Sequence, residues 1–358
     1  MRSAANTMVM SDSIATVTSR SGGAGGIGMR RLSVIIANHN YEQYVALAIQ
    51  SALDLRWGDL EVIVVDDGST DGSRAVIEGF SDRVKVLLTE NASQRVAANR
   101  GYAMSTGDVV VFLDSDDVLP PDLPERLATV WNPTVSKVQF QMQRIDRAGA
   151  LIGTPFPTYR PVPTAADIKR WARTTTAYPT PPGSGNAYAR WFLDRIFPIE
   201  AEAGDASDSA CLAAAPFFGD VVSLPGVVVG YRQHGANDSD LLKDDLRFPR
   251  EVARARARWR YAQRVQGTSI DRIDERPLFR SRELLQLRVA SRRVAPDARP
   301  LPDDSWARML LDSLRAPFQI GPESMLRRLV VSIWCIALLV APSPLARPLL
   351  TARYGRRA

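Results

Sequence analysis

The sequence predicts an α/β protein whose mostly parallel sheet is flanked by helices, with a helical extension at its carboxy-terminal end. Short apolar runs recur between residues 32 and 113, and segments with helical spacing separate them. Strands that alternate with helices form a parallel sheet that helices cover on both faces. The Arg-rich, helix-favouring stretch at 241–293 predicts the extension.

Four apolar runs are short enough to be buried strands of the parallel sheet: 32–37, 60–65, 84–88 and 109–113. Apolar side chains at helical spacing predict helices at 45–53 and 76–80, and 93–104 is also expected to be helical. Asn40 is a candidate cap for the first of these helices. The Pro- and Thr-rich stretch 155–182 predicts loop.

Composition narrows the classes of function only slightly. Lys and Arg total 45 against 39 Asp and Glu, a net charge of +6, which suits phosphate-bearing ligands or anionic lipid without choosing between them. Cys211 and Cys335 are far apart and match no metal-ligand spacing, so we expect no disulfide scaffold and a reducing cytoplasm. A G-x-G-x-x-G pattern at 23–28 precedes the first strand instead of following one, which argues against a dinucleotide site.

Polar loops follow three of the predicted strands, at 38–40, 66–71 and 114–117. Ligands of such sheets bind outside the carboxyl ends of the strands. We therefore expect these three loops to form one pocket.

Two of the loops carry paired carboxylates. Asp114 and Asp116 stand in a D-x-D pattern that can hold Mg²⁺ or Mn²⁺ with positions left for diphosphate oxygens, although a solvated acidic turn has the same composition. Asp66 and Asp67 follow a buried strand, where a carboxylate can accept from a nucleobase N–H or a ribose hydroxyl. Capping of the following helix is the alternative for this second pair.

Taken in order, the motifs resemble those of family 2 glycosyltransferases, which share the Rossmann-like GT-A fold. The motifs are SVIIANHN at 33–40, DDGSTDG at 66–72, NASQRVAANRG at 91–101, TGD at 106–108 and DSDD at 114–117. The resemblance is close over 31–125 and looser to about residue 240. One departure is Ala37, where many members of the family have Pro.

The resemblance implies roles for individual residues. It places Asp67 at the nucleobase with Asp66 beside it, and Asn38 and Asn40 in the nucleotide pocket. Arg95 and Asn99 would face the ribose or phosphate. Asp114 and Asp116 would bind the sugar-nucleotide and its metal. Asp117 is a possible direct metal ligand. His234, at the end of a late strand, resembles the family's metal-binding His, although a structural role is the alternative.

An inverting transfer also requires a base that takes the acceptor hydroxyl's proton. Similar enzymes place an Asp at the start of a helix in this region, which implies Asp208 with Asp205 as second choice; N-capping is the alternative for Asp208. Asn186 is a candidate for the acceptor wall.

The last apolar run, 329–341, has arginines on both sides. At 1.5 Å per residue it reaches about 20 Å, short of a ~30 Å hydrocarbon core. An in-plane membrane anchor with basic flanks fits this length, and a helix docked on the protein itself is the alternative.

These observations predict four parts: a flexible leader at 1–30, a GT-A catalytic domain at 31–240, an Arg-rich helical extension at 241–325, and a membrane-associating segment at 326–358. The catalytic domain would have a nucleotide-binding half (31–125) and an acceptor half (126–240). We expect a cytoplasmic transferase peripheral to the inner face of the cell membrane. It would use a divalent metal (Mn or Mg) and a nucleotide-diphosphate sugar as donor. The acceptor would be a glycan or lipid-linked glycan of bacterial polysaccharide synthesis, and we expect no binding of nucleic acid. The alternatives are a nucleotidyltransferase and a non-catalytic sugar-nucleotide or membrane-surface binding module.

Overall fold

A computed structural model describes residues 29–204, 206–234, 241–242 and 244–355. Its sheet runs in the order β3-β2-β1-β4-β7-β5-β6, and β8 pairs with the other edge of β5. The strands are β1 Leu32–Asn38, β2 Leu60–Asp67, β3 Lys85–Thr89, β4 Val109–Asp114, β5 Val135–Ile145, β6 Leu151–Phe156, β7 Asn186–Ala189 and β8 Asp220–Arg232. The first four are parallel to one another, whereas β7 is antiparallel to both β4 and β5.

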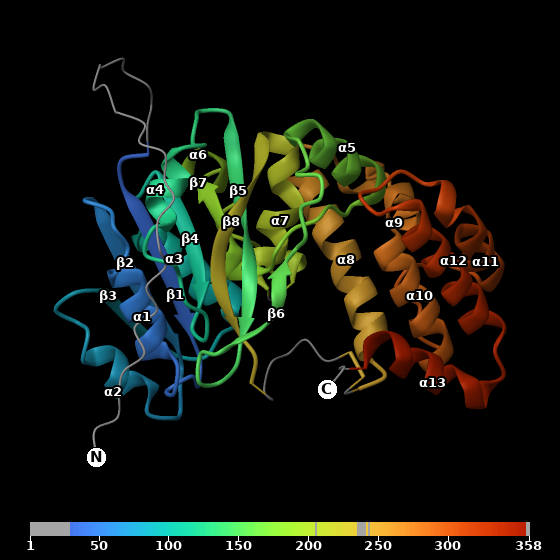
Figure 1. Ribbon diagram of the computed structural model, residues 1–358, viewed down its shortest axis with the longest axis horizontal. Coiled ribbons are helices and arrows are strands. Elements are labelled where there is room, and N and C mark those ends of the chain that lie inside the picture. Colours follow the sequence, from blue (N-terminus) through green and yellow to red (C-terminus); the bar gives the residue numbers. More distant parts are fainter. Residues whose placement is uncertain (1–28, 205, 235–240, 243, 356–358) are drawn as a thin grey trace.

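Helices lie on both faces of this sheet and continue beyond it (Figure 1). Those of the first half are α1 Val45–Leu53, α2 Ser73–Glu78, α3 Gln94–Met104 and α4 Leu123–Ala128. The middle contains α5 Ala165–Thr175, the 3-10 turn η1 Gly183–Gly185, α6 Arg190–Leu193, η2 Ala201–Ala203 and α7 Ser207–Phe218. The carboxy-terminal helices are α8 Arg247–Arg264, η3 Ile270–Arg272, α9 Arg276–Arg280, α10 Arg282–Val294, α11 Trp306–Arg315, η4 Ala316–Phe318, α12 Met325–Val340 and α13 Ser343–Tyr354.

The strand residues alternate between two hydrophobic cores, as the period of a strand requires. Val34 and Val64 belong to the core under α1, α2 and α4, whereas Ile35 and Ile63 belong to the core under α3, α6 and α7. The predicted class, a mostly parallel α/β sheet flanked by helices with a helical carboxy-terminal part, is confirmed.

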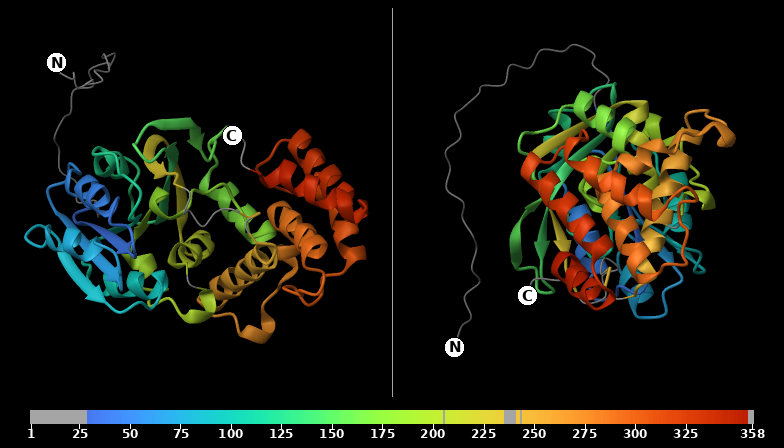
Figure 2. Two further views of the ribbon diagram at one scale, coloured as in Figure 1. Left: turned by 90° about the horizontal axis from the view of Figure 1, so that it is seen from below. Right: turned by 90° about the vertical axis from the view of Figure 1, so that its right-hand side faces the viewer.

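A third core lies among the carboxy-terminal helices, at the opposite end of the molecule from β3 (Figures 1 and 2). Helix α8 joins it to the sheet, because Phe248 packs in the third core while Tyr261 packs in the core beneath α7. The buried Arg288 of α10 pairs with Asp304 and Asp312, which fastens α11 and the loop before it.

Two local predictions were wrong. Asn40 does not cap α1, whose N-cap is Tyr44 without a side-chain hydrogen bond. The expected loop at 155–182 contains α5, which begins at a reciprocal capping box between Thr164 and Asp167. This T-x-x-D pattern was the sequence signal for the helix, and the surrounding prolines obscured it.

One buried carboxylate ties the parallel strands together. Glu61 of β2 accepts from Ser33 Oγ (2.6 Å), Gly107 N (3.0 Å) and Lys85 Nζ (2.8 Å), which joins β1, β3 and the turn before β4. Burial alone would raise the pKa of Glu61, but hydrogen bonds from Lys85, Ser33 and Thr106 outweigh it and lower the pKa to about 2.

Replacing Glu61 with Gln should therefore destabilise the protein by about 1–3 kcal/mol near neutral pH, since charge-assisted hydrogen bonds are lost. A lowered native pKa stabilises the fold above the unfolded value of 4.5, and this stabilisation disappears as the pH falls toward 2. In urea unfolding, the variant's loss of unfolding free energy should be largest at pH 7 and smaller at pH 3. The control is Glu78→Gln, which changes an exposed glutamate on α2. A Glu61→Gln deficit that does not depend on pH would contradict the explanation.

Candidate functional site

The three polar loops meet in a cavity of about 460 Å³ at the carboxyl ends of β1, β2 and β4, which we call the strand-end cavity. Its wall is made of Ala37, Asn38, His39, Tyr41, Asp67, Asn91, Ser93, Gln94, Ala97, Asp114, Ser115, Asp116 and Tyr231. The structure thus brings together four of the predicted site residues here: Asn38, Asp67, Asp114 and Asp116.

Asn38 and Asp67 form part of the wall in different ways. Asn38 Nδ2 donates to Asp66 and Ser69, while its buried Oδ1 has no partner among the described residues. Asp67 accepts from the backbone N–H groups of Ala92 (2.9 Å) and Ser93 (3.0 Å), so it holds the loop that leads into α3.

Asp66 lies beneath the loop and is not part of the cavity wall. Its carboxylate accepts from Ser69 N (3.0 Å), Ser69 Oγ (2.5 Å) and Arg74 Nε (2.9 Å). Burial by itself would raise its pKa, but these hydrogen bonds and that from Asn38 outweigh burial and lower the pKa below its usual value. The structure therefore places Asp66 where it shapes the turn after β2.

Asn40 also lies outside the strand-end cavity. Its φ is 59°, and its Oδ1 accepts from Thr70 N at 2.7 Å, which locks the β1 loop onto the β2 loop. The neighbouring His39 lines the cavity instead, with Nδ1 donating to Asp67 O at 2.8 Å. Sequence reasoning missed His39, although its place between two asparagines at a strand end was a signal.

Arg95 and Asn99 were expected to face the ribose or phosphate, and the structure places them elsewhere. Both donate to the carbonyl of Ile199, at 3.1 and 2.9 Å, and Ile199 N donates back to Asn99 at 2.8 Å. They tie α3 to the loop before η2. Gln94, at the start of the same helix, lines the cavity and donates to Asp114 at 3.3 Å.

The acidic loop after β4 is deeply buried. Burial, then the charges of Asp116 and Asp208, raise the pKa of Asp114 to about 8. Burial, Asp114 and Asp116 raise the pKa of Asp117 well above its usual value. Asp117 Oδ1 accepts from Arg232 N at 3.0 Å, whereas its Oδ2 has no partner in the described part of the chain.

His234 meets this loop from the end of β8. Its Nε2 lies 2.8 Å from Asp116 Oδ2, and its ring stacks on Tyr44 with centroids 5.1 Å apart. Apart from the residues that the structure leaves undescribed, no three His, Cys, Asp or Glu side chains gather into a group that could hold a metal. Asp116 and His234 are thus brought together as predicted, and Asp117 is directed at Arg232.

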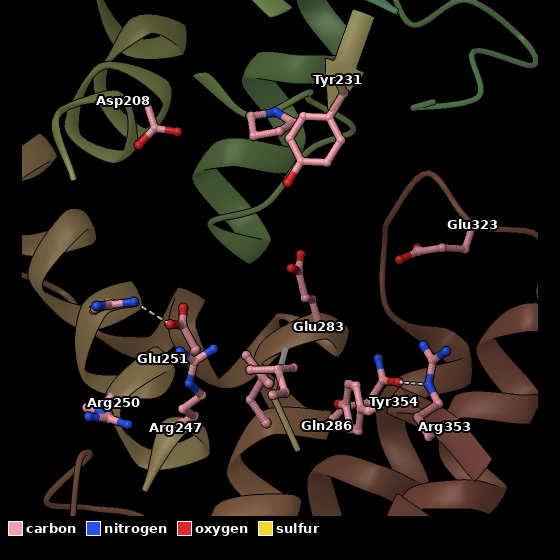
Figure 3. A pocket seen from close by; sticks show the side chains of 14 residues that line it. Asp208, Tyr231, Arg247, Arg250, Glu251, Glu283, Gln286, Glu323, Arg353 and Tyr354 are labelled. Carbon is pink, nitrogen blue, oxygen red and sulfur yellow. Dashed lines mark hydrogen bonds and ion pairs between the residues drawn. The ribbon is translucent and has the colours of Figure 1, made fainter. Parts of the chain in front are cut away.

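A second cavity of about 910 Å³ lies between the sheet and the carboxy-terminal helices (Figure 3), and we call it the helical cavity. Pro182, Asp208 and Tyr231 line its sheet side. The facing wall comes from α8, α10, α13 and the loop before α12, and its charged members are Arg247, Arg250, Glu251, Arg254, Glu283, Glu323 and Arg353. Because Tyr231 lines both cavities, they meet at the end of β8.

Asp208 stands at this junction, in the first turn of α7. It accepts from Gly183 N at 3.1 Å, and its charge contributes to the raised pKa of Asp114. The N-cap of α7 is Ala206, so the capping alternative for Asp208 was wrong. Asp205 lies outside the described residues.

Asn186 was expected in the acceptor wall, but it is fully buried. Its Nδ2 donates to the carbonyls of Pro181, Pro182 and Gly183, and its Oδ1 accepts from Lys137 Nζ at 3.0 Å. Asn186 therefore shapes the turn η1, which presents Gly183 to Asp208. Burial lowers the pKa of Lys137 well below its usual value.

Residues 33–181 match the model of glycosyl transferase family 2. An uncharacterized glycosyltransferase of Nostoc sp. is 36% identical over 214 residues, which cover 58% of this chain and 66% of the relative. The region that these matches cover belongs to glycosyltransferase family 2. A Campylobacter jejuni relative, GalNAc(5)-diNAcBac-PP-undecaprenol beta-1,3-glucosyltransferase, is 36% identical over 96 residues, 25% of this chain and 31% of its own length.

These matches cover less than two thirds of the relatives' own lengths. Among solved structures, the mannosyltransferase PcManGT of Pyrobaculum calidifontis superposes with a TM-score of 0.50 at 18% identity, over 90% of this chain and 86% of that one. At such low identity the likeness concerns the fold, and the predicted GT-A-type fold of this family 2 glycosyltransferase is confirmed.

The contacts of Asn99 predict a structural role. Asn99→Ala removes two hydrogen bonds to Ile199 and should lower the free energy of unfolding by about 1–3 kcal/mol. Binding of UDP or GDP with Mn²⁺, measured by calorimetry, should be unchanged, whereas Gln94→Ala in the cavity wall should weaken it. Weaker nucleotide binding by Asn99→Ala without any loss of stability would return Asn99 to the nucleotide site.

Proposed function

We propose that this chain transfers a sugar from a nucleotide-diphosphate sugar to a hydroxyl of a glycan or lipid-linked glycan, with inversion at the anomeric carbon. The observation that carries the proposal is the meeting of the two cavities at Tyr231, with Asp114 and Asp208 beside the junction. The strand-end cavity would hold the donor and the helical cavity the acceptor. The match of residues 33–181 to glycosyl transferase family 2 supports sugar transfer.

The donor site would use the cavity wall at the strand ends. The free Oδ1 of Asn38 can accept an N–H or O–H of the nucleoside. His39 and Gln94 add polar groups at the same wall. PcManGT was solved with GDP-Man and Mn²⁺, which is consistent with a nucleotide-sugar donor and a divalent cation here.

The residues around Asp116 fit a divalent cation. Asp116 and His234 are in contact, and Asp117 Oδ2 is a buried carboxylate oxygen without a partner among the described residues. Mg²⁺ and Mn²⁺ are often held by one or two carboxylates while substrate phosphates and water complete the coordination. Such a cation would offset the negative charge of the departing diphosphate.

Asp208 would act as the base. The acceptor oxygen forms a bond to the anomeric carbon, the bond to the diphosphate breaks, and the hydroxyl proton passes to Asp208. A single displacement of this kind inverts the configuration. Asp205 remains the second choice.

We also propose that the enzyme works in polysaccharide synthesis at the inner face of the cell membrane. The name of the Campylobacter relative describes an undecaprenol-linked acceptor, which supports a lipid-linked acceptor here. The alternatives are a nucleotidyltransferase and a non-catalytic binding module. Sugar transfer in the following experiments would exclude the binding module.

Metal dependence is the first expected outcome. Release of nucleoside diphosphate from a panel of UDP- and GDP-sugars should stop in excess chelator and return when Mn²⁺ or Mg²⁺ is added. His234→Gln should raise the concentration of Mn²⁺ needed for half-maximal activity. Full activity in excess chelator would remove the metal from the mechanism.

Substitutions of two carboxylates should separate binding from proton transfer. Asp208→Asn keeps the shape of the side chain but cannot take the proton, so transfer should fall by about 10²–10⁴-fold while nucleotide binding is unchanged. Asp116→Asn should weaken Mn²⁺-dependent nucleotide binding, and transfer should fall with it.

The product of this reaction, examined by NMR, should have the anomeric configuration opposite to that of the donor. Near-normal transfer by Asp208→Asn would shift the assignment to Asp205. Retention of configuration would reject the single displacement.

A further inference from the structure

Large apolar side chains are exposed along α11, η4 and α12, at the end of the molecule that faces the viewer in the right-hand view of Figure 2. The most exposed are Phe318 (80%), Leu326 (72%) and Ile333 (65%). We call the set the apolar face: Leu311, Leu314, Phe318, Leu326, Val330 and Ile333. Monomeric soluble proteins rarely expose large contiguous apolar patches, and such patches mark interaction sites.

The helical period explains how α12 is both docked and exposed. Cys335, Leu338 and Leu339 lie on the stripe that packs into the third core. Leu326, Val330 and Ile333 recur every three or four residues on another stripe and remain exposed. The Ser332 hydroxyl donates to Ser313 O at 2.7 Å, which joins α12 to α11, so the exposed residues lie on neighbouring helices.

We propose that the apolar face docks on a lipid bilayer that contains anionic headgroups. Arg315 and Arg327 adjoin the face, are exposed, and have no ion-pair partner among the residues that the structure describes. Glu323 is the sole acidic residue between positions 313 and 358, and it pairs with Arg282. Basic residues beside a buried apolar face are attracted to anionic lipid.

The charge also favours lipid over a second copy of the chain. A two-fold dimer presents the same patch from both subunits. Pairing of two apolar faces would bring the unpaired arginines of each copy to the same interface without acidic partners. Anionic headgroups supply the missing negative charge.

The face would lie in the plane of the membrane surface. No described helix is long and apolar enough to cross a membrane. Helix α12 has 16 residues, which extend about 24 Å, and one of its stripes is occupied by the protein core.

The orientation links this surface to the helical cavity. Glu323 lies between η4 and α12 and lines that cavity. A lipid-linked acceptor could therefore keep its lipid in the bilayer while its sugar enters the cavity toward Asp208. This last step rests on the proposed function, whereas the docking surface does not.

The test is flotation of the full chain with vesicles of phosphatidylcholine, alone or mixed with phosphatidylglycerol, without any sugar nucleotide. The wild type should float with the mixed vesicles and much less with phosphatidylcholine alone. The variant with Leu326→Gln, Val330→Gln and Ile333→Gln should bind at least about tenfold more weakly, because the apolar stripe is lost. Arg315→Gln with Arg327→Gln should reduce the preference for phosphatidylglycerol.

The matched control is Leu151→Gln, which replaces a 75% exposed leucine on β6 and should float like the wild type. Thermal unfolding should show that the triple variant is folded, and Phe318→Ser at the turn repeats the test with one exposed residue. Equal flotation of wild type and triple variant would overturn the proposal. The proposal would also be overturned if the wild type did not bind vesicles and light scattering showed it to be a dimer, while the triple variant was a monomer. Either result would leave glycosyl transfer unaffected, since flotation uses no donor.

Discussion

Mutual repulsion among buried carboxylates is the constraint around which this protein is organised. Asp114, Asp116 and Asp117 share one short loop, and Asp208 approaches it from α7. Charges of one sign are costly to bury together unless cations or hydrogen bonds offset them. The chain offers partial compensation from β8, where the Arg232 backbone N–H binds Asp117 and His234 contacts Asp116. The long strand β8 brings these groups to the loop from more than a hundred residues away.

The same constraint explains the turn η1. Gly183 lies between the carboxylates of Asp114 and Asp208, and a Cβ on it would stand 2.7 Å from Asp114 Oδ2. The turn is held in place by Asn186, which in turn binds the buried Lys137. This polar network thus sets the spacing between Asp114 of the strand-end cavity and Asp208 of the helical cavity.

The sequence predicted the strands and the meeting of their loops because both follow from hydrophobic periodicity and parallel topology. It could not assign side-chain direction within a motif. Asp66 and Asp67 are adjacent on a strand, so they point to opposite sides, and only Asp67 reaches the cavity. Arg95 and Asn99 are four residues apart on α3 and share a face. That face meets Ile199, which lies about a hundred residues further along the chain, so the contact could not be read from the helix alone.

The carboxy-terminal run forms a helix that is packed on one stripe and exposed on another. A membrane anchor and a docking helix were alternatives as long as the apolar run was treated as uniform. In the structure, Cys335 and Leu338 pack into the protein while Leu326 and Ile333 stay exposed. Helix α8 then connects this end to the site, since the Tyr261 hydroxyl donates to Ile196 O and Phe248 packs in the third core. Because α8 packs in both cores, a surface that fixes α11 and α12 on a bilayer would also fix the direction from which an acceptor enters the helical cavity.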